Sequence, residues 1–238
     1  MISGEAGRAS ESQIRYGSIP GGRALDLIVA IVGLILLCPV MMLVVLAIWV
    51  ESGWPVFFSQ ERLAQGGRSF RIHKFRKFHR DSGTNGPPLT TKDDSRLTQV
   101  GKFIDRAKLN ELPQLWNVLK GDMSIVGPRP ETLDFADCFK GTYRRVLDYK
   151  PGIIGPSQVF FRNEVSFFPE DADPSQYYRE VLFPLKARID MAYFSERTVL
   201  SDIGWIVCGA MAVFGWRLLS PDVLCHAPEA SSLRRGTL

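Results

Sequence analysis

The chain has 238 residues, of which 45% are hydrophobic and 23% charged, and its formal net charge is +4. This length suffices for one domain with a real core, or for a smaller domain plus a membrane segment. The modest net charge argues against a dedicated nucleic-acid-binding protein, so we expect no nucleic-acid partner. The four cysteines and three histidines show no metal-ligand spacing, which indicates reduced cysteines and no zinc site.

The first strong pattern is a long apolar segment near the N-terminus. Residues 1–22 are rich in Gly, Ser, Arg and Glu, which predicts a disordered tail. The run from Leu27 to Val50 carries no charge and is long enough to cross a bilayer. Pro39 lies at its middle and predicts a kink or break. Basic residues flank both ends, so a kinked span and a re-entrant segment both remain open, with the downstream domain in the cytoplasm.

Downstream of this segment the sequence predicts mostly helices and one hairpin. Apolar and basic residues alternate around a Gly66-Gly67 turn, which is typical of a short hairpin. Turn residues over 82–98 predict a surface loop. Helical spacing follows over Gly101–Lys120 and Tyr177–Arg197. The apolar run Ile203–Leu219 is short for a span and predicts a helix at the membrane interface, with two tryptophans at headgroup depth. Together these elements predict a mainly helical α+β fold.

One stretch, KLNELPQLWNVLKGDMSIVGPRPE, covers Lys108 to Glu131 and combines helix signals with a polar pair. Three- and four-residue spacing predicts one buried stripe, formed by Leu112, Leu115, Trp116 and Leu119. Asn110 is placed as the N-cap, Glu111 in the first turn, and Gly121 as the glycine that ends the helix. Under this interpretation the stretch is only a capped helix.

The same helix start also suits a phosphate, because it presents free amide hydrogens and a partial positive charge. Basic side chains that could converge on a substrate phosphate are Lys74, Arg76, Lys77, Arg96, Arg106 and Arg129. Arg129 lies between two prolines that stiffen its backbone, and its guanidinium matches phosphate oxygens. Acidic residues available to hold Mg²⁺ against a diphosphate are Asp94, Glu111 and Asp122. The basic residues near the membrane segment also suit anionic lipid headgroups.

Several motifs together resemble the bacterial sugar transferase family, the monotopic phosphoglycosyl transferases. These motifs are GGRALDLIVAIVGLILLCPV, PVFFSQERLAQGGRSFRIHKFRKF, TKDDSRLTQVGKF, LNELPQLWNVLKGDMSIVGPRPE, KPGIIGP and LKARIDMAYFSERTVLSDI. They extend from about Arg23 to Phe214, most of the chain. The block from Leu112 to Pro130 is the most specific of them.

The resemblance implies an architecture and a reaction. It implies a re-entrant helix–break–helix over 23–51 hinged at Pro39, followed by a cytoplasmic transferase domain with membrane-interface helices over 52–219. The sequence after this domain, 220–238, predicts a disordered tail. The implied reaction moves a sugar-1-phosphate from a UDP-sugar to undecaprenyl phosphate, releases UMP and requires Mg²⁺. The expected location is the bacterial inner membrane, with the site facing the cytoplasm beside the lipid bilayer. Downstream glycosyltransferases are expected partners, and the apolar surface is compatible with a homodimer.

The resemblance also implies roles for individual residues. In the family, the first member of an Asp-Glu pair attacks the phosphate that bears the sugar. By position, Glu111 is the second member of that pair, Lys74 contacts the phosphates and Arg129 binds an anion. Asp190 and Tyr193 match a C-terminal motif near the nucleotide.

Two positions depart from the family pattern. Asn110 replaces the attacking Asp, and a carboxamide has no anionic oxygen. Asp105 stands where many relatives have a basic residue. Three accounts remain open: another carboxylate such as Glu111 or Asp94 is the nucleophile, the lipid phosphate attacks the UDP-sugar directly, or the chain is an inactive membrane-anchored scaffold partner of glycan-assembly enzymes. The sequence does not determine which sugar is transferred.

Overall fold

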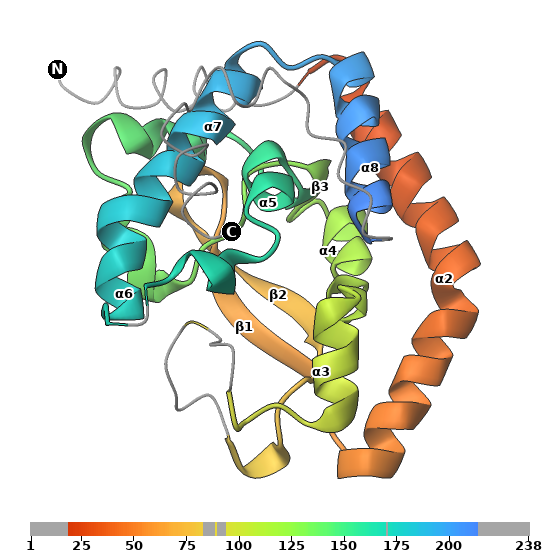
Figure 1. Cartoon of the computed structure of the whole chain (residues 1–238). Helices are drawn as coiled ribbons and strands as arrows, with labels where there is room; N and C mark the ends of the chain where they lie inside the picture. Colours follow the sequence, from red (N-terminus) through yellow and green to blue (C-terminus); the bar gives the residue numbers. More distant parts are fainter. Residues whose placement is uncertain (1–18, 83–88, 90–93, 170, 214–238) are drawn as a thin grey trace, which may run out of the picture.

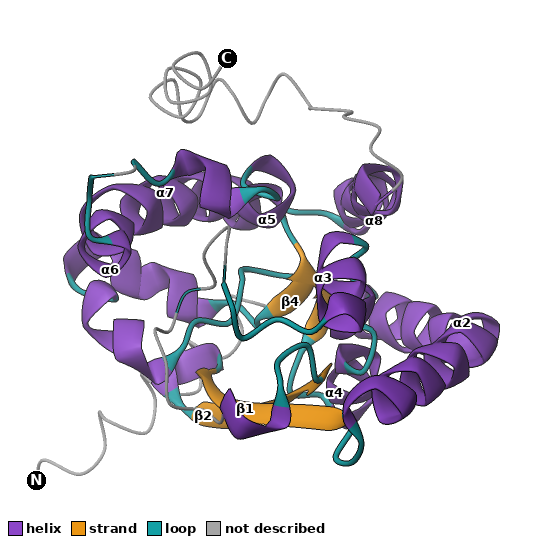
Figure 2. Ribbon diagram, turned by 60° about the horizontal axis from the view of Figure 1, so that its bottom comes forward, coloured by secondary structure: helices purple, strands orange, loops and turns teal. Residues whose placement is uncertain are grey.

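The computed structural model describes residues 19–82, 89, 94–169 and 171–213. Its helices include α2 (Gly22–Ser52), α3 (Gln99–Arg106), α4 (Gln114–Lys120), α5 (Pro156–Phe160), α6 (Pro174–Tyr177), α7 (Phe183–Ser195) and α8 (Val199–Val213). Its strands are β1 (Phe57–Leu63), β2 (Ser69–Phe75), β3 (Ser124–Val126) and β4 (Gly152–Ile154). Figure 2 shows α2 on one side of the two small sheets and α6 and α7 on the other. The prediction of a mainly helical α+β fold is confirmed.

The two predicted tails and most of the predicted surface loop lie outside the described residues. The exception is the end of the N-terminal segment, because α2 already begins at Gly22.

Helix α2 contains the long apolar segment. It is a single helix of 31 residues that continues through Pro39, so the predicted break into two helices is not seen. Proline removes one backbone hydrogen bond, and a long helix tolerates that loss by bending. Figure 1 shows α2 curving along one side of the molecule. Its length and composition are sufficient to cross a membrane.

Both ends of α2 are attached to the rest of the chain by polar contacts, which are buried at the N-terminal end and exposed at the C-terminal end. Near the N-terminal end, Asp26 accepts hydrogen bonds from the hydroxyl of Ser124 and the amide of Ile125, both at 2.8 Å. At the C-terminal end, Glu51 accepts a hydrogen bond from the amide of Gln99 at 2.7 Å. The two ends of α2 therefore contact the same folded body.

Between these attachments, α2 leaves large apolar side chains exposed, and α8 does the same. The most exposed include Ile35, Leu36, Leu43, Val50, Leu200 and Val207. An exposed apolar surface of this extent is typical of a membrane-contacting face.

The hairpin is confirmed at the predicted turn. Strands β1 and β2 are antiparallel, with Phe57 opposite Phe75 and Leu63 opposite Ser69. Gly66 and Gly67 have φ values of 75° and 77°, a left-handed conformation that favours glycine. This hairpin carries Lys74 near the end of β2.

The second sheet joins two segments that are distant in sequence. Strands β3 and β4 are parallel, with Val126 opposite Ile154. The segments approach so closely that a Cβ on Gly127 would lie 2.3 Å from the carbonyl oxygen of Lys150. Glycine is therefore required where the chain leaves β3, and this close packing fixes the position of Arg129 two residues later.

The segment predicted as one helix over Gly101–Lys120 is divided in two. Helices α3 and α4 are separated by a 3₁₀ turn, Leu109–Glu111. Lys108 has a φ of 59°, and this left-handed conformation ends the first helix. Asn110 is therefore not the N-cap of α4. Its side-chain oxygen is buried and has no hydrogen-bond partner among the described residues.

The buried face of α4 also differs from the predicted stripe. Trp116 is 55% exposed, whereas Asn117 is fully buried because its amide group pairs with the hairpin. The Asn117 oxygen accepts from the amide of His73 at 3.0 Å, and its nitrogen donates to the carbonyl of Arg71 at 2.8 Å. The predicted end of the helix is confirmed, since Gly121 has a φ of 90°.

The C-terminal helices close the main core. Helices α6 and α7 are joined by a π-helical turn, Tyr178–Leu182, so the predicted helix over Tyr177–Arg197 is largely confirmed. Leu182, Leu185 and Ile189, which share one side of this helical segment, are buried. Helix α8 begins at Val199, and its Trp205 is only 8% exposed. This tryptophan packs in the core against the ring of Tyr193 and so does not face the surface, and Trp216, the second tryptophan of the predicted interface helix, lies outside the described residues.

Candidate active site

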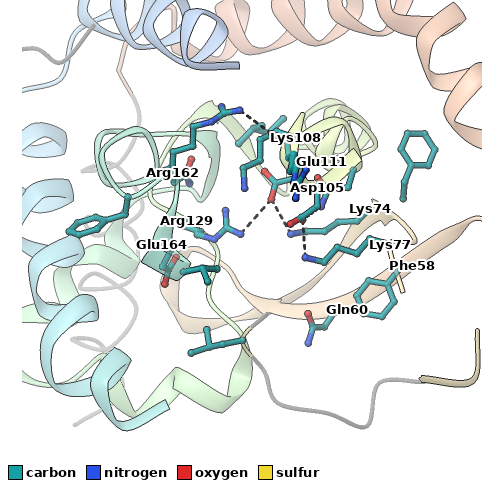
Figure 3. Close-up of a pocket in the computed structure, with 18 of the residues that line it drawn as sticks. Phe58, Gln60, Lys74, Lys77, Asp105, Lys108, Glu111, Arg129, Arg162 and Glu164 are labelled. Atoms are coloured by element: carbon teal, nitrogen blue, oxygen red, sulfur yellow. Dashed lines mark hydrogen bonds and ion pairs between the residues drawn. The ribbon is translucent and has the colours of Figure 1, made fainter. Parts of the chain in front are cut away.

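A cavity of about 1770 Å³ lies between the hairpin, the α3–α4 connection and the segment that follows β3. Its walls are chemically divided. One part is lined by charged side chains, and Figure 3 shows Lys74, Lys108 and Arg129 among those around Glu111. Another part is lined by apolar residues of α2 and α8, namely Val29, Gly33, Leu37, Ile206 and Ala210. A ligand with a charged head and an apolar tail would fit this division.

Glu111 occupies the centre of the charged part. Its Oε1 lies 3.2 Å from Lys74 Nζ and 3.4 Å from Arg129 Nη2. Burial alone would raise the pKa of Glu111, but Lys74, Arg129 and Lys108 together lower it well below the usual range. Glu111 is therefore a stable carboxylate that holds two cations in place.

The surrounding cations respond to the same environment. Burial lowers the pKa of Lys74 to about 7, although the Glu111 carboxylate acts in the opposite direction. Burial also lowers the pKa of Lys108, again against the influence of Glu111. Burial opposes the charged form of Arg129 as well, but Glu111 prevails and raises its pKa. An incoming phosphate would favour the charged form of all three groups.

A second polar group lines the cavity beside Glu111. Lys77 Nζ lies 2.8 Å from Asp105 Oδ1, and Asn110 Nδ2 donates to the same oxygen at 3.3 Å. Asp105 is in the last turn of α3 and Asn110 in the 3₁₀ turn that follows. The two positions that depart from the family pattern are therefore hydrogen-bonded partners.

A buried network supports the Arg129 side of the cavity. The hydroxyl of Tyr178 donates to Glu131 at 2.5 Å and accepts from Lys186 at 3.0 Å. Lys186 also forms an ion pair with Glu164 at 3.3 Å. The sequence analysis missed Lys108, Arg162, Glu164 and Lys186. The VFFRNE stretch carried a signal for two of them, since it places Arg162 and Glu164 two residues apart.

The three other predicted substrate-binding arginines line the cavity in different ways. The guanidinium of Arg76 donates to the carbonyls of Ser52 and Gly53 at 3.0 and 2.7 Å, so it caps the end of α2. Arg96 forms a two-pronged contact with Asp94, at 2.8 and 2.6 Å. Arg106 is exposed at the end of α3. Of these, Arg106 has the most accessible side chain for a ligand.

Asp190 and Tyr193 do not line the cavity, so the structure does not bring them to a substrate there. Asp190 accepts hydrogen bonds from Ser157, 2.8 Å from the hydroxyl and 3.2 Å from the amide. Burial raises the pKa of Asp190 to about 7, although these hydrogen bonds lower it. Tyr193 donates to Asp202 at 2.7 Å. Asp190 links α7 to α5 and Tyr193 links α7 to α8. This structural role accounts for both residues of the motif without a bound ligand.

The predicted Mg²⁺ ligands do not converge. Among the described residues, no three His, Cys, Asp or Glu side chains are grouped to hold a metal. Asp94 uses both oxygens for Arg96. Asp122 pairs with Lys120 at 3.0 Å, at the opposite end of α4 from Glu111. Mg²⁺ often needs only one or two carboxylates when substrate phosphates supply the other oxygens. The cavity therefore fits an ion that arrives with a diphosphate.

The fold and cavity define a class of protein: one with a long apolar helix and a cationic cavity that borders an apolar surface. Comparison with known proteins assigns the family. Residues 19–216 match the bacterial sugar transferase family, and the chain belongs to it.

Three relatives illustrate the range of sugars. The chain is 35% identical over 200 residues to the galactosyl transferase CpsE of Streptococcus agalactiae, covering 79% of this chain and 41% of the relative. It is 36% identical over 193 residues to the UDP-N-acetylgalactosamine-undecaprenyl-phosphate N-acetylgalactosaminephosphotransferase of Aeromonas hydrophila, covering 76% and 44%. It is 38% identical over 198 residues to the UDP-glucose:undecaprenyl-phosphate glucose-1-phosphate transferase of Xanthomonas campestris, covering 80% and 38%. The chain thus spans less than half the length of these relatives.

Proposed function

We propose that this protein transfers a sugar-1-phosphate from a UDP-sugar to undecaprenyl phosphate, giving undecaprenyl-diphosphate-sugar and UMP. Family membership and the names of the relatives support this reaction class. The step would begin the membrane phase of exopolysaccharide or O-antigen synthesis. Enzymes that extend the lipid-linked sugar would then consume the product. Separately, the homodimer stays a prediction.

The observation that carries the proposal is the group formed by Glu111, Lys74 and Arg129 in a cavity with an apolar wall. The reaction must bring together a soluble diphosphate and a lipid phosphate. Fixed cations stabilise the charge that develops during phosphoryl transfer. Glu111 keeps Lys74 and Arg129 3.2 and 3.4 Å away from one oxygen, so both are oriented before substrate arrives.

We further propose that α2 enters the bilayer and returns to the same face, bent at Pro39, with the active site on the cytoplasmic side of the inner membrane. The attachments of Asp26 and Glu51 support this arrangement, because both ends of α2 contact the same folded body. A helix that crossed the bilayer would place its ends on opposite sides. The basic residues after α2 support the cytoplasmic orientation.

Mg²⁺ is part of the proposal as an ion bound with the substrate diphosphate. The carboxylates of Glu111 and Asp105 line the same cavity, and either could supply one ligand to such an ion. When bound, the ion would offset negative charge on the diphosphate.

The test is acceptor-dependent release of UMP. Purified protein in lipid nanodiscs would receive undecaprenyl phosphate, Mg²⁺ and, separately, UDP-glucose, UDP-galactose or UDP-N-acetylgalactosamine. We expect release with at least one donor, and a rate about 100-fold lower for Arg129→Met, since removing one donor to the transition-state charge typically has this effect. Asp122→Asn is the matched control and should retain the wild-type rate.

The competing scaffold function makes a different prediction. If no donor yields UMP, the proposed reaction is rejected. Binding to lipid vesicles without any thermal shift from UDP-sugar and Mg²⁺ would then support a binding role.

A further inference from the structure

The carboxylates that line the cavity differ in how many of their oxygens already pair with a cation. Asp94 directs both oxygens at Arg96. Glu164 directs both oxygens at Lys186, at 3.5 and 3.3 Å. Neither carboxylate can reach a substrate phosphorus without giving up an existing ion pair.

Glu111 is committed in a different way. Three cations stabilise its charge, and its side chain is only 13% exposed. A carboxylate that is strongly stabilised as an anion is a weak nucleophile, because attack would disperse the charge that the cations hold. Its removal from Lys74 and Arg129 would also disorganise the two groups that are best placed to bind phosphate.

Asp105 is more accessible than Asp94, Glu111 or Glu164, with its side chain 29% exposed. Both of its polar contacts, from Lys77 and Asn110, meet at Oδ1. The other oxygen, Oδ2, has no hydrogen-bond partner among the described residues. The amide of Asn110 thus orients the carboxylate, and Lys77 offsets its repulsion from an incoming phosphate.

The amide of Asn110 is better suited to orienting Asp105 than a carboxylate at the same position would be. A second carboxylate there would lie about 3.3 Å from Asp105 Oδ1, the separation that the Asn110 nitrogen now has. Two carboxylates this close share a proton, and one becomes neutral. Asn110 avoids that repulsion and donates a hydrogen bond in its place.

We propose that Asp105 is the nucleophile of the transfer reaction, oriented by the amide of Asn110, so that the two residues act as one acid–amide unit. This inference rests on the proposed function. Oδ2 forms a bond to the phosphorus that carries the sugar while the bond from that phosphorus to the UMP oxygen breaks, and UMP leaves with the electron pair. An oxygen of the lipid phosphate then attacks the same phosphorus, and the acyl phosphate bond breaks to restore the carboxylate. No proton is consumed in either step.

The first experiment locates the covalent intermediate. Wild-type protein would be incubated with a productive UDP-sugar and Mg²⁺ without lipid acceptor, quenched and digested. We expect a burst of about one UMP per chain, and a hexose-phosphate mass on the peptide that contains Asp105. Hydroxylamine should remove this mass and leave a hydroxamate on Asp105. An adduct on Glu111, Asp94 or Glu164, or an active protein with neither burst nor adduct, would overturn the inference.

The second experiment uses variants of the pair. Asp105→Asn should release UMP at least 100-fold more slowly while UDP-sugar still raises its melting temperature, which shows that it folds and binds. The exchange variant, Asp105→Asn with Asn110→Asp, places the carboxylate at position 110 and the amide at position 105. Its rate of UMP release should be at least tenfold higher than that of the single variant, and the adduct should form on residue 110. A single variant that keeps more than a third of the wild-type rate, or an exchange variant with no gain, would contradict the acid–amide unit.

The two proposals fail differently. An active wild-type protein whose rate does not depend on Asp105 leaves the proposed function intact and removes only this inference. A wild-type protein that releases no UMP with any donor removes both.

Discussion

Replacement of Glu111 by glutamine tests the central group of the cavity. The change keeps the shape of the side chain but removes the negative charge beside Lys74 and Arg129, which lie 3.2 and 3.4 Å away. Two partly buried cations, with side chains 14% and 33% exposed, then lack a counter-charge. Breaking a buried pair on one side costs about 3–5 kcal/mol, and we take the lower value of ~3 kcal/mol because the glutamine oxygen still accepts a hydrogen bond.

This loss can be measured as a change in melting temperature. For chains of this size, ~1 kcal/mol corresponds to about 2–4 °C, so Glu111→Gln should melt roughly 6–12 °C below the wild type in phosphate-free buffer. Inorganic phosphate should stabilise the variant more than the wild type, because it supplies the missing negative charge; a ligand at 100 times its Kd contributes about 2.7 kcal/mol.

The control is Asp122→Asn. It removes a carboxylate whose partner, Lys120, is largely exposed, and such a pair is worth about 0–1 kcal/mol. The reasoning would be refuted if Glu111→Gln melted within 2 °C or so of the wild type, with the same response to phosphate.

Three further predictions concern pH and packing. The affinity of the wild type for UDP-glucose should fall as pH rises through about 7, because Lys74 loses its proton there. The Lys74→Arg variant should bind UDP-glucose with the same affinity from pH 6 to 9, as measured by calorimetry. A wild-type affinity that does not change with pH would contradict this prediction. Burial raises the folded-state pKa of Asp190 from 3.8 to about 7, so the contribution of its carboxyl to stability is lost as pH rises through that range. Asp190→Asn should therefore gain stability relative to the wild type between pH 5 and 8, by at most ~3 kcal/mol. Thermal melts at both pH values would show no such gain if the carboxyl titrates normally. Gly127→Ala would place a Cβ 2.3 Å from the carbonyl oxygen of Lys150. The resulting displacement of Arg129 should slow UMP release about 100-fold. If the variant kept the wild-type rate, the β3–β4 contact would not be what positions the site.

The sequence determined the elements whose signals are local. The Gly66-Gly67 turn predicted the hairpin, because a left-handed conformation at both positions needs glycine. Gly121 predicted the end of α4 for the same reason. The charge-free run from Leu27 to Val50 predicted a long apolar segment, although not that its helix continues through Pro39, and the motif from Leu112 to Pro130 identified the family. Lys74, Glu111 and Arg129, which each belong to such a motif, lie together in the structure, and their roles in catalysis stay predictions.

Tertiary structure decided which polar residues share a site. Asp122 and Glu111 belong to the same motif, yet α4 lies between them and only Glu111 lines the cavity. Asp190 belongs to a family motif, but its carboxyl accepts hydrogen bonds from Ser157 in the core instead of facing the cavity. Asn110 satisfied every local rule for an N-cap, but it lies in a separate turn and donates to Asp105. Helix and turn preferences depend on neighbours in sequence, whereas the partner of a buried amide depends on which segments pack against it. For this reason the sequence could indicate the family and the reaction class, and only the packing of α3 against the following turn could pair an acid with the unexpected amide.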